Sequence, residues 1–272
     1  MILKRRSELE VMAKAAVINR DALEAVERAL RPGVTTAELN ALAEDVILSR
    51  GGKPAFKGYG GTGSAPPFPG TICASVNEVV VHGFPSSRQL VDGDIISIDI
   101  GTFYRGYAAD MAGTYAVGTV PVETLRLLTA TERSLAAGIA AAQAGNRLGD
   151  VSAAIQGVVE EAGFWVVREF VGHGIGREFH EAPEVPNYGR AGTGPVLRPG
   201  LVLAIEPMVA LRRTRVLVAD DGWTAFTENG SMAAHFEHTV AITEDGPWVL
   251  SASGETGVPK RAELATGGVH GA

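Results

Sequence analysis

The chain has 272 residues, of which 46% are hydrophobic and 20% are charged, which is typical of a globular protein. Its formal net charge of −7 argues against nucleic acid or a membrane surface as the main partner, because both attract basic proteins. The single cysteine, Cys73, excludes an intrachain disulfide, and no apolar run is long enough for a signal peptide or a membrane-spanning helix, so we expect a cytoplasmic protein.

Helices and short strands are predicted to alternate along the chain. Capping-box patterns at residues 7–10 and 35–38 predict the starts of two helices, and a loop rich in glycine and proline follows over about residues 51–70. Hydrophobic periodicity then predicts strands near 76–81, 95–102 and 107–117, helices near 124–144 and 150–162, and strands near 165–170, 201–210 and 235–243.

The two halves of the sequence resemble each other. Glycines bound a predicted helix at 33–51 and again at 145–163, with the same spacing. The segments 93–99 and 200–206 each run from a glycine through an apolar strand to an acidic residue. Chance similarity between short strands is the alternative explanation. A duplication implies one α+β domain made of two related halves, with a site where they meet.

Four carboxylates interrupt predicted apolar strands: Asp99, Asp110, Glu206 and Glu237. An unpaired buried carboxylate is costly, and two divalent cations would balance the charge of all four. Oxygen ligands with a single imidazole suit Mn, Fe, Co or Zn. For Asp99 alone, the polar face of an amphipathic strand is an equal alternative.

The histidines divide into two groups. A lone histidine is usually structural, but glycines on both sides of His173 allow a close backbone approach, and His180 follows seven residues later, which favours a functional role. By strand alternation, His235 faces the same side as Glu237 and could support it, whereas His238 faces the other side.

Five short motifs occur in order: Ser75-Val-Asn-Glu-Val-Val-Val-His82-Gly, Gly172-His173-Gly-Ile-Gly, Phe179-His180-Glu, Ile205-Glu206-Pro-Met208 and Phe236-Glu237-His-Thr. With the two strand aspartates, they resemble the type I methionine aminopeptidases over about residues 3–250, in the short bacterial form. The resemblance implies the pita-bread fold, in which two pseudo-symmetric helix-plus-β-hairpin halves surround a central curved antiparallel sheet. We expect one catalytic domain over 1–253, with pseudo-repeats at about 7–118 and 122–245, and a disordered tail over 254–272.

The resemblance also implies a metal centre. Asp110 and Glu237 are expected to bridge two divalent ions, with Asp99 completing one ion and His173 with Glu206 completing the other. The ions are Co, Mn, Fe(II) or Zn, and a water that bridges them is the expected nucleophile. Glu206 is also expected to pass the proton of that water to the departing amine.

The same resemblance assigns the substrate contacts. His180 is expected to donate to the scissile carbonyl, and His82 to lie near the scissile amide and assist positioning. An apparent insertion at residues 62–67 departs from the family pattern, so the resemblance does not determine the shape of the rim of the substrate pocket. A methionine side-chain pocket is expected from Tyr59, Phe68, Cys73, Phe179 and Trp223, together with His82 and His180. For Cys73, a nucleophilic thiol is the alternative.

The implied function is removal of the initiator methionine from nascent proteins whose second residue is small. The expected partners are the N-termini of nascent chains at the ribosome. The resemblance also implies that the protein is a monomer. One alternative is a proline-specific peptidase of the same fold, which usually carries an additional amino-terminal domain. Another is a non-catalytic binding module, although such relatives have lost metal ligands and this sequence has all five.

Overall fold

The computed structural model describes residues 1–61 and 65–252 of the chain. Its four helices are α1 (Arg6–Ala29), α2 (Thr36–Ser49), α3 (Val122–Ala141) and α4 (Leu148–Glu161). The strands of its main sheet are β1 (Lys53–Pro54), β2 (Ile72–Val76), β4 (Ile95–Tyr104), β5 (Tyr107–Ala116), β7 (Gly172–Gly174), β8 (Glu181–Val185), β9 (Val202–Ile205), β14 (Glu237–Thr243) and β15 (Gly246–Val249).

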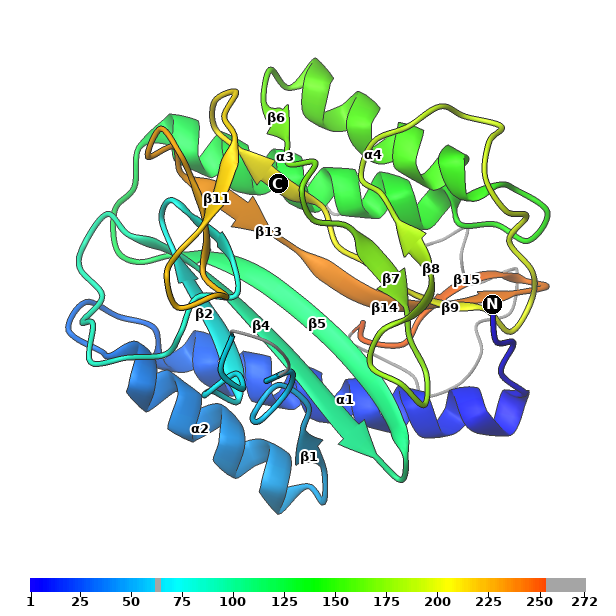
Figure 1. Ribbon diagram of the computed structural model, residues 1–272, viewed down its shortest axis with the longest axis horizontal. Coiled ribbons are helices and arrows are strands. Elements are labelled where there is room, and N and C mark those ends of the chain that lie inside the picture. The colour runs from blue at the N-terminus through cyan, green and yellow to red at the C-terminus, as the bar shows by residue number, and fades with distance from the viewer. Residues whose placement is uncertain (62–64, 253–272) are drawn as a thin grey trace, which may run out of the picture.

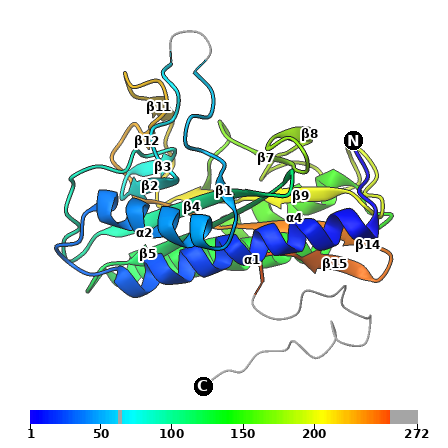
Figure 2. The same cartoon turned by 90° about the horizontal axis from the view of Figure 1, so that it is seen from below.

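The main sheet is antiparallel and runs in the order β1-β4-β5-β14-β9-β7-β8, with β2 beside β4 and β15 beside β14. Figure 1 shows α1 and α2 along one side of the molecule and α3 and α4 along the other, with β4, β5 and β14 crossing between them. Two small sheets are formed by β6 (Trp165–Val166), β10 (Met208–Ala210) and β13 (Ala233–His235), and by β3 (Val79–Val81), β11 (Val216–Val218) and β12 (Ala225–Thr227). In Figure 2, β3, β11 and β12 lie on the opposite face of the sheet from α1.

Each helix pair packs on the strands of its own half. In β4, Ile96, Ile98 and Ile100 are fully buried against α1 and α2, so Asp99 faces the other side of the sheet, as strand alternation predicts. In the second half, α3 and α4 pack in the same way on β9 and β14. The apolar faces of both halves therefore point to the helices, and their polar residues meet on the opposite face.

The glycines of the sequence repeat have matching backbone conformations. Gly33 (φ 90°) and Gly145 (φ 92°) each donate a backbone hydrogen bond to a leucine carbonyl, at 2.7 and 2.9 Å. Gly93 (φ 94°) and Gly200 (φ 91°) precede β4 and β9 in the same left-handed region, which favours glycine. The two halves therefore share backbone conformations at these four positions.

The helix starts differ in one place from prediction. At α2, Glu38 N–H donates to Thr35 Oγ1 at 3.2 Å and Thr35 N–H donates to the Glu38 carboxylate at 2.8 Å, which confirms the second capping box. The predicted box at 7–10 is wrong, because α1 already begins at Arg6. There, Arg5 N–H donates to the Glu8 carboxylate at 2.7 Å.

Several predicted strands are shorter than expected or were missed. The strand predicted at 201–210 breaks into β9 and β10 because Pro207 has no N–H to continue the ladder. The strand predicted at 235–243 breaks at Phe236, and the one at 165–170 ends at Val166. The strand predicted at 76–81 contains β3 and only the last residue of β2. Sequence patterns did not reveal β1, β7, β8, β11, β12 or β15, which are short.

Three remaining expectations concern the C-terminal tail, the apparent insertion and membrane-spanning helices. The predicted disordered tail, 254–272, and residues 62–64 of the apparent insertion lie outside the described residues. Within the described part of the chain, no helix has the length and hydropathy needed to cross a membrane.

Candidate active site

Strand register places three carboxylates on one face of the sheet. Asp99 on β4 lies opposite Ala112 on β5, and Ala112 lies opposite Glu237 on β14. Asp110 is two residues from Ala112 on β5, so its side chain points to the same face. The Thr239 hydroxyl accepts from Asp110 N–H and donates to Asp110 O, at 2.8 and 2.7 Å, which fixes β5 against β14 at this point.

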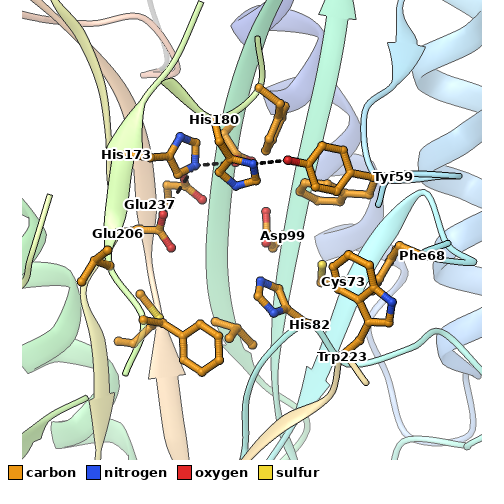
Figure 3. A pocket seen from close by; sticks show the side chains of 17 residues that line it. Tyr59, Phe68, Cys73, His82, Asp99, His173, His180, Glu206, Trp223 and Glu237 are labelled. Atoms are coloured by element: carbon orange, nitrogen blue, oxygen red, sulfur yellow. Dashed lines mark hydrogen bonds and ion pairs between the residues drawn. The ribbon is translucent and has the colours of Figure 1, made fainter. Parts of the chain in front are cut away.

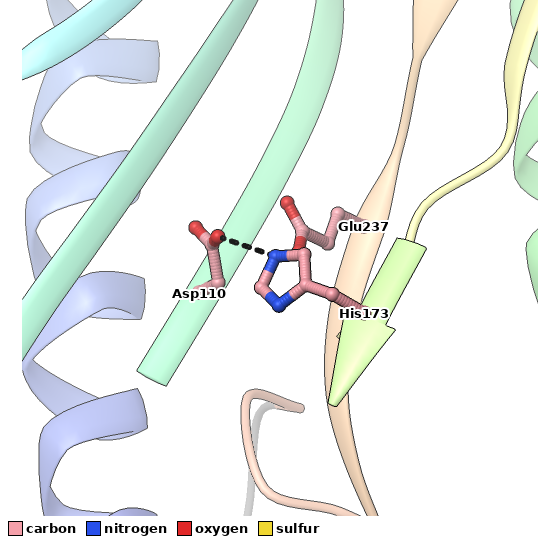
Figure 4. Close-up of side chains that lie close together, drawn as sticks. All are labelled: Asp110, His173 and Glu237. Atoms are coloured by element: carbon pink, nitrogen blue, oxygen red, sulfur yellow. Dashed lines mark ion pairs between the residues drawn. The ribbon is translucent and has the colours of Figure 1, made fainter. Parts of the chain in front are cut away.

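The second half contributes an imidazole and a fourth carboxylate. His173 on β7 pairs with Ala204 on β9, and Glu206 directly follows β9 at the proline break. His173 Nε2 lies 3.6 Å from Glu206 Oε1 and 3.8 Å from Asp110 Oδ2. One ligand atom each of Asp110, His173 and Glu237 lies within 4.8 Å of the others (Figure 4).

The tautomer of His173 follows from its contacts. Its Nδ1 lies 2.9 Å from Gly174 O, and a carbonyl oxygen can only accept, so Nδ1 carries the proton. Nε2 therefore faces the carboxylates and is the nitrogen that can bind a cation. This is the arrangement that a histidine metal ligand needs, with its other nitrogen held by a carbonyl.

Asp99, Asp110, Glu206 and Glu237, hereafter the carboxylate cluster, have no ordinary counter-charge. Among the described residues, no lysine or arginine forms an ion pair with any of them, and Asp99 Oδ1 and Glu237 Oε1 lack a hydrogen-bond partner. Burial, followed by the neighbouring acidic charges, raises the pKa of Asp99, Asp110 and Glu237 well above the usual range, and burial raises that of Glu206 to about 7. Divalent cations would remove this penalty, and the oxygen-rich set with one imidazole fits them.

His235 lies against the carboxylate cluster. The sequence predicted it only as a supporting residue. Its Nε2 is buried, has no hydrogen-bond partner among the described residues, and lies 3.5 Å from Glu206 Oε2 and 3.9 Å from Glu237 Oε2. The sequence signal for it was that His235 and Glu237 share a strand face. The other side of β14 carries His238, whose Nδ1 instead contacts Ser251 Oγ at 2.9 Å.

All twelve predicted site residues line one cavity of about 180 Å³ (Figure 3). His173, Glu206 and Glu237 lie on one side, Cys73, Phe68 and Trp223 lie on the other, and Asp99 lies between the two groups. Five lining residues were missed by sequence reasoning, because as apolar side chains they carry no signal beyond proximity to a motif: Phe56, Val81, Phe170, Val171 and Met208.

The pKa values of the two predicted catalytic histidines are both lowered from the ordinary value. His180 lies between His173 and Tyr59, with its Nδ1 2.5 Å from the Tyr59 hydroxyl. Burial, followed by the charges of His173 and His82, lowers the pKa of His180 to about 4. Burial likewise lowers the pKa of His82 to about 4.

Cys73 belongs to the apolar wall of the cavity. It lies opposite Asp99 across β2 and β4, and burial together with that carboxylate raises the pKa of its thiol well above the usual range. A thiol held protonated is a poor nucleophile, so the pocket interpretation is favoured. Nearby, Trp223 Nε1 donates to Pro66 O at 2.7 Å, which attaches the described end of the apparent insertion to the pocket wall.

Comparison with known proteins identifies the family. Residues 10–244 match metallopeptidase family M24. The chain belongs to this family. It is therefore a metal-dependent hydrolase, as the resemblance implied.

Similar M24 proteins span almost the whole chain. The methionine aminopeptidase of Clostridium perfringens is 49% identical over 251 residues, covering 92% of this chain and 98% of that protein. The crystal structure of methionine aminopeptidase from Thermotoga maritima has a TM-score of 0.89 and 45% identity, and covers 93% of this chain and all of that one. The prolidase from Pyrococcus furiosus, at 23% identity and a TM-score of 0.75, shows the shared fold and is matched over only 66% of its length. The predicted pita-bread fold is confirmed.

The carboxylate cluster predicts how pH affects the stability of the metal-free M24 chain. A carboxyl whose pKa is raised by folding keeps its proton when the unfolded chain has lost it, so the free energy of unfolding falls as pH rises between the two pKa values. The slope is about 1.4 kcal/mol per pH unit for each such carboxyl. Histidines whose pKa is lowered act in the opposite direction, but only below their ordinary value of 6.5.

Above about pH 6.5, stability of the metal-free protein is therefore expected to fall with pH. Urea unfolding of chelator-treated protein at several pH values measures this, and a parallel series with saturating Mn(II) should show a flatter dependence. A metal-free stability that stays level or rises above this pH would contradict the burial of charged carboxylates.

Proposed function

We propose that this chain removes the N-terminal methionine from newly made proteins, with a preference for a small second residue. The observation that carries the proposal is one cavity that combines a group of metal-binding carboxylates with an apolar aromatic wall. The carboxylates can bind the metal ions needed for hydrolysis, and the apolar wall can bind the thioether side chain of methionine. The relatives named methionine aminopeptidase support the same activity.

The carboxylate cluster and His173 are proposed to hold two divalent ions. Asp99, Asp110, His173, Glu206 and Glu237 would supply the ligands, with Asp110 and Glu237 as the ligands common to both ions. The charge of four carboxylates supports two ions rather than one. When bound, the ions supply Lewis acidity at the scissile carbonyl and lower the pKa of water. Co, Mn, Fe(II) and Zn all suit these donors.

The protein's own groups then position the peptide and move protons. The Glu206 carboxylate is proposed to accept a proton from the attacking water and to deliver it to the departing amine nitrogen. His180, neutral and at one edge of the cluster, donates from Nε2 to the scissile carbonyl oxygen as negative charge develops there. His82, which lies across the cavity, helps to position the scissile amide.

The methionine side chain is proposed to occupy the apolar end of the cavity. Phe68 and Trp223 meet edge to face, with ring centroids 5.4 Å apart, and Cys73 lies beside them. Phe179 packs against Gly101, where an added Cβ would lie 2.6 Å from its ring. These rigid aromatic contacts define a pocket without charge, which favours methionine over polar side chains.

The activity is tested by cleavage of a Met-Ala-Ser peptide with metal-free protein, to which Co(II), Mn(II), Fe(II) or Zn(II) is added back separately. We expect free methionine only when metal is present, and the series ranks the ions. An Ala-Pro-Ala peptide serves as the control for a proline-specific peptidase and should remain intact. Folded, metal-loaded protein that releases no methionine would overturn the proposal.

Tyr59 is expected to select the tautomer of His180. Donation from the Tyr59 hydroxyl to Nδ1 leaves the ring proton on Nε2, where it can reach the substrate. Tyr59→Phe removes this donor, so we expect kcat to fall about 3- to 10-fold. Steady-state kinetics measure the change. Tyr104→Phe, a tyrosine outside the cavity, is the matched control, and equal kinetics of the two variants would refute the role.

We further propose that residues 1–253 act as one catalytic domain with the two pseudo-repeats, and that the protein is a cytoplasmic monomer acting on nascent chains at the ribosome. The matching glycine conformations of the two halves motivate the proposal of one domain with two repeats, and the free, buried Cys73 motivates the proposal of a cytoplasmic protein.

Limited proteolysis should leave a core of about residues 1–253. Sedimentation of the protein alone and with ribosomes tests its oligomeric state and its docking.

A further inference from the structure

A buried ion pair joins the start of the chain to the loop that carries His180. Lys4 Nζ lies 2.5 Å from Glu181 Oε2, and the two side chains expose only 3% and 4% of their surface. Every other lysine or arginine ion pair in the described part of the chain has a side chain exposed by at least 18%. Both charges of a pair this well shielded from water have lost their hydration, so loss of one partner leaves an uncompensated buried charge and is costly.

Glu181 also closes the loop itself. Its other oxygen, Oε1, accepts from Arg177 N–H at 2.9 Å and from Glu178 N–H at 3.4 Å. One carboxylate therefore fixes both the turn at 177–178 and the attachment to Lys4. The loop residues between these contacts are Phe179 and His180, which line the cavity.

Two glycines make room for the segment around Lys4. Lys4 N–H donates to Gly200 O at 2.7 Å, and a Cβ added to Gly200 would lie 2.6 Å from Lys4 O. A Cβ added to Gly176 would collide with the Lys4 side chain and with the Glu181 carboxylate. The contact is thus built into two separate loops of the fold.

Besides ring contacts with Tyr59, His173 and Phe179, the His180 side chain makes few polar contacts. Its side chain has one hydrogen-bond partner among the described residues, Tyr59, and it directly precedes Glu181 in the chain. Successive side chains point to opposite sides here, with His180 toward the cavity and Glu181 toward Lys4. A shift of Glu181 would therefore move the His180 imidazole relative to the scissile carbonyl.

We propose that Lys4 is a positioning residue, which acts through the Glu181 carboxylate to hold the His180 imidazole at the scissile carbonyl. The inference rests on the proposed peptidase function and adds the amino-terminal segment to the active site. It predicts a loss in kcat that depends on His180 and leaves metal binding intact. A misplacement of about 1 Å can cost up to about 10²-fold in rate.

The experiment compares Lys4→Met in two backgrounds, the natural protein and His180→Ala. In the natural background, we expect kcat for Met-Ala-Ser to fall about 10- to 100-fold, with KM and the midpoint of Mn(II) titration unchanged. In the His180→Ala background, Lys4→Met should change kcat less than twofold, because the group through which it acts is gone. Lys14→Met, on an exposed part of α1, is the matched control and should behave as the natural protein.

The outcomes separate this inference from the proposed function. Release of methionine by the natural protein establishes the reaction independently of Lys4. Equal fold-losses in both backgrounds, or a shifted Mn(II) midpoint, would mean general destabilisation and would overturn the positioning role. If Lys4→Met fails to fold, Glu181→Gln, which keeps the side-chain volume, carries the same two-background test, and unchanged kcat in that variant would also overturn the role.

Discussion

Asp110→Asn is expected to abolish metal-dependent release of methionine, with kcat/KM falling by at least about 10³-fold. Asp110 lies between the two halves of the site, 3.8 Å from His173 Nε2 and on the same sheet face as Glu237. The substitution keeps the size of the side chain and removes its charge. Because Thr239 bonds only to the Asp110 backbone, the local fold should remain.

Activity and stability should change in opposite directions in this variant. Burial raises the pKa of Asp110 well above its usual range, so ionising it costs free energy in the metal-free protein. At about pH 8, metal-free Asp110→Asn should therefore unfold at higher urea concentration than the metal-free natural protein, whereas Mn(II) should stabilise it less.

The control for Asp110→Asn is Asp45→Asn, which removes an exposed carboxylate from α2 and should leave activity and stability within error. If Asp110→Asn kept more than about a tenth of the natural activity with saturating metal, the proposed role of Asp110 as a metal ligand would be refuted.

His180→Ala should lower kcat about 10²- to 10³-fold, which is the usual effect of removing one donor to a developing oxyanion. The neutral ring can donate from Nε2, since Tyr59 contacts Nδ1 and burial keeps the pKa of His180 at about 4. The loss should appear in kcat more than in KM, because the charge on the carbonyl oxygen develops only in the transition state.

Steady-state kinetics together with Mn(II) titration test the role of His180. The His173 and His180 ring centroids are 4.2 Å apart, so a metal ligand and a transition-state donor must be told apart by metal affinity. We expect the affinity of His180→Ala for Mn(II) to be unchanged, and Glu184→Ala, an exposed residue on β8, to behave as the natural protein. A large loss of metal affinity would instead place His180 among the ligands.

Much of the site could be predicted from the sequence because its signals are local. Strand alternation alone placed Asp99 on the face opposite Ile98, and the glycine-bounded repeats indicated two related halves. Acidic residues inside apolar strands need a counter-charge whatever the fold, so the metal centre could be inferred before any geometry was known. The family motifs then specified which reaction such a centre serves.

Tertiary structure alone decided how these residues meet. The alignment of Asp99 with Glu237 across β5 depends on strand register, which local patterns do not fix. The break at Pro207, which turns Glu206 toward His235, was hidden inside a continuous apolar run.

The contacts that orient His180 are still less local. Tyr59 is 121 residues away from it, and Lys4 is 177 residues away from Glu181. Pairings over such distances depend on how the whole chain packs rather than on the neighbours of either residue. The sequence by itself therefore determined the family and the chemistry and predicted the ligands, whereas the fold decided which side chains surround the predicted catalytic groups.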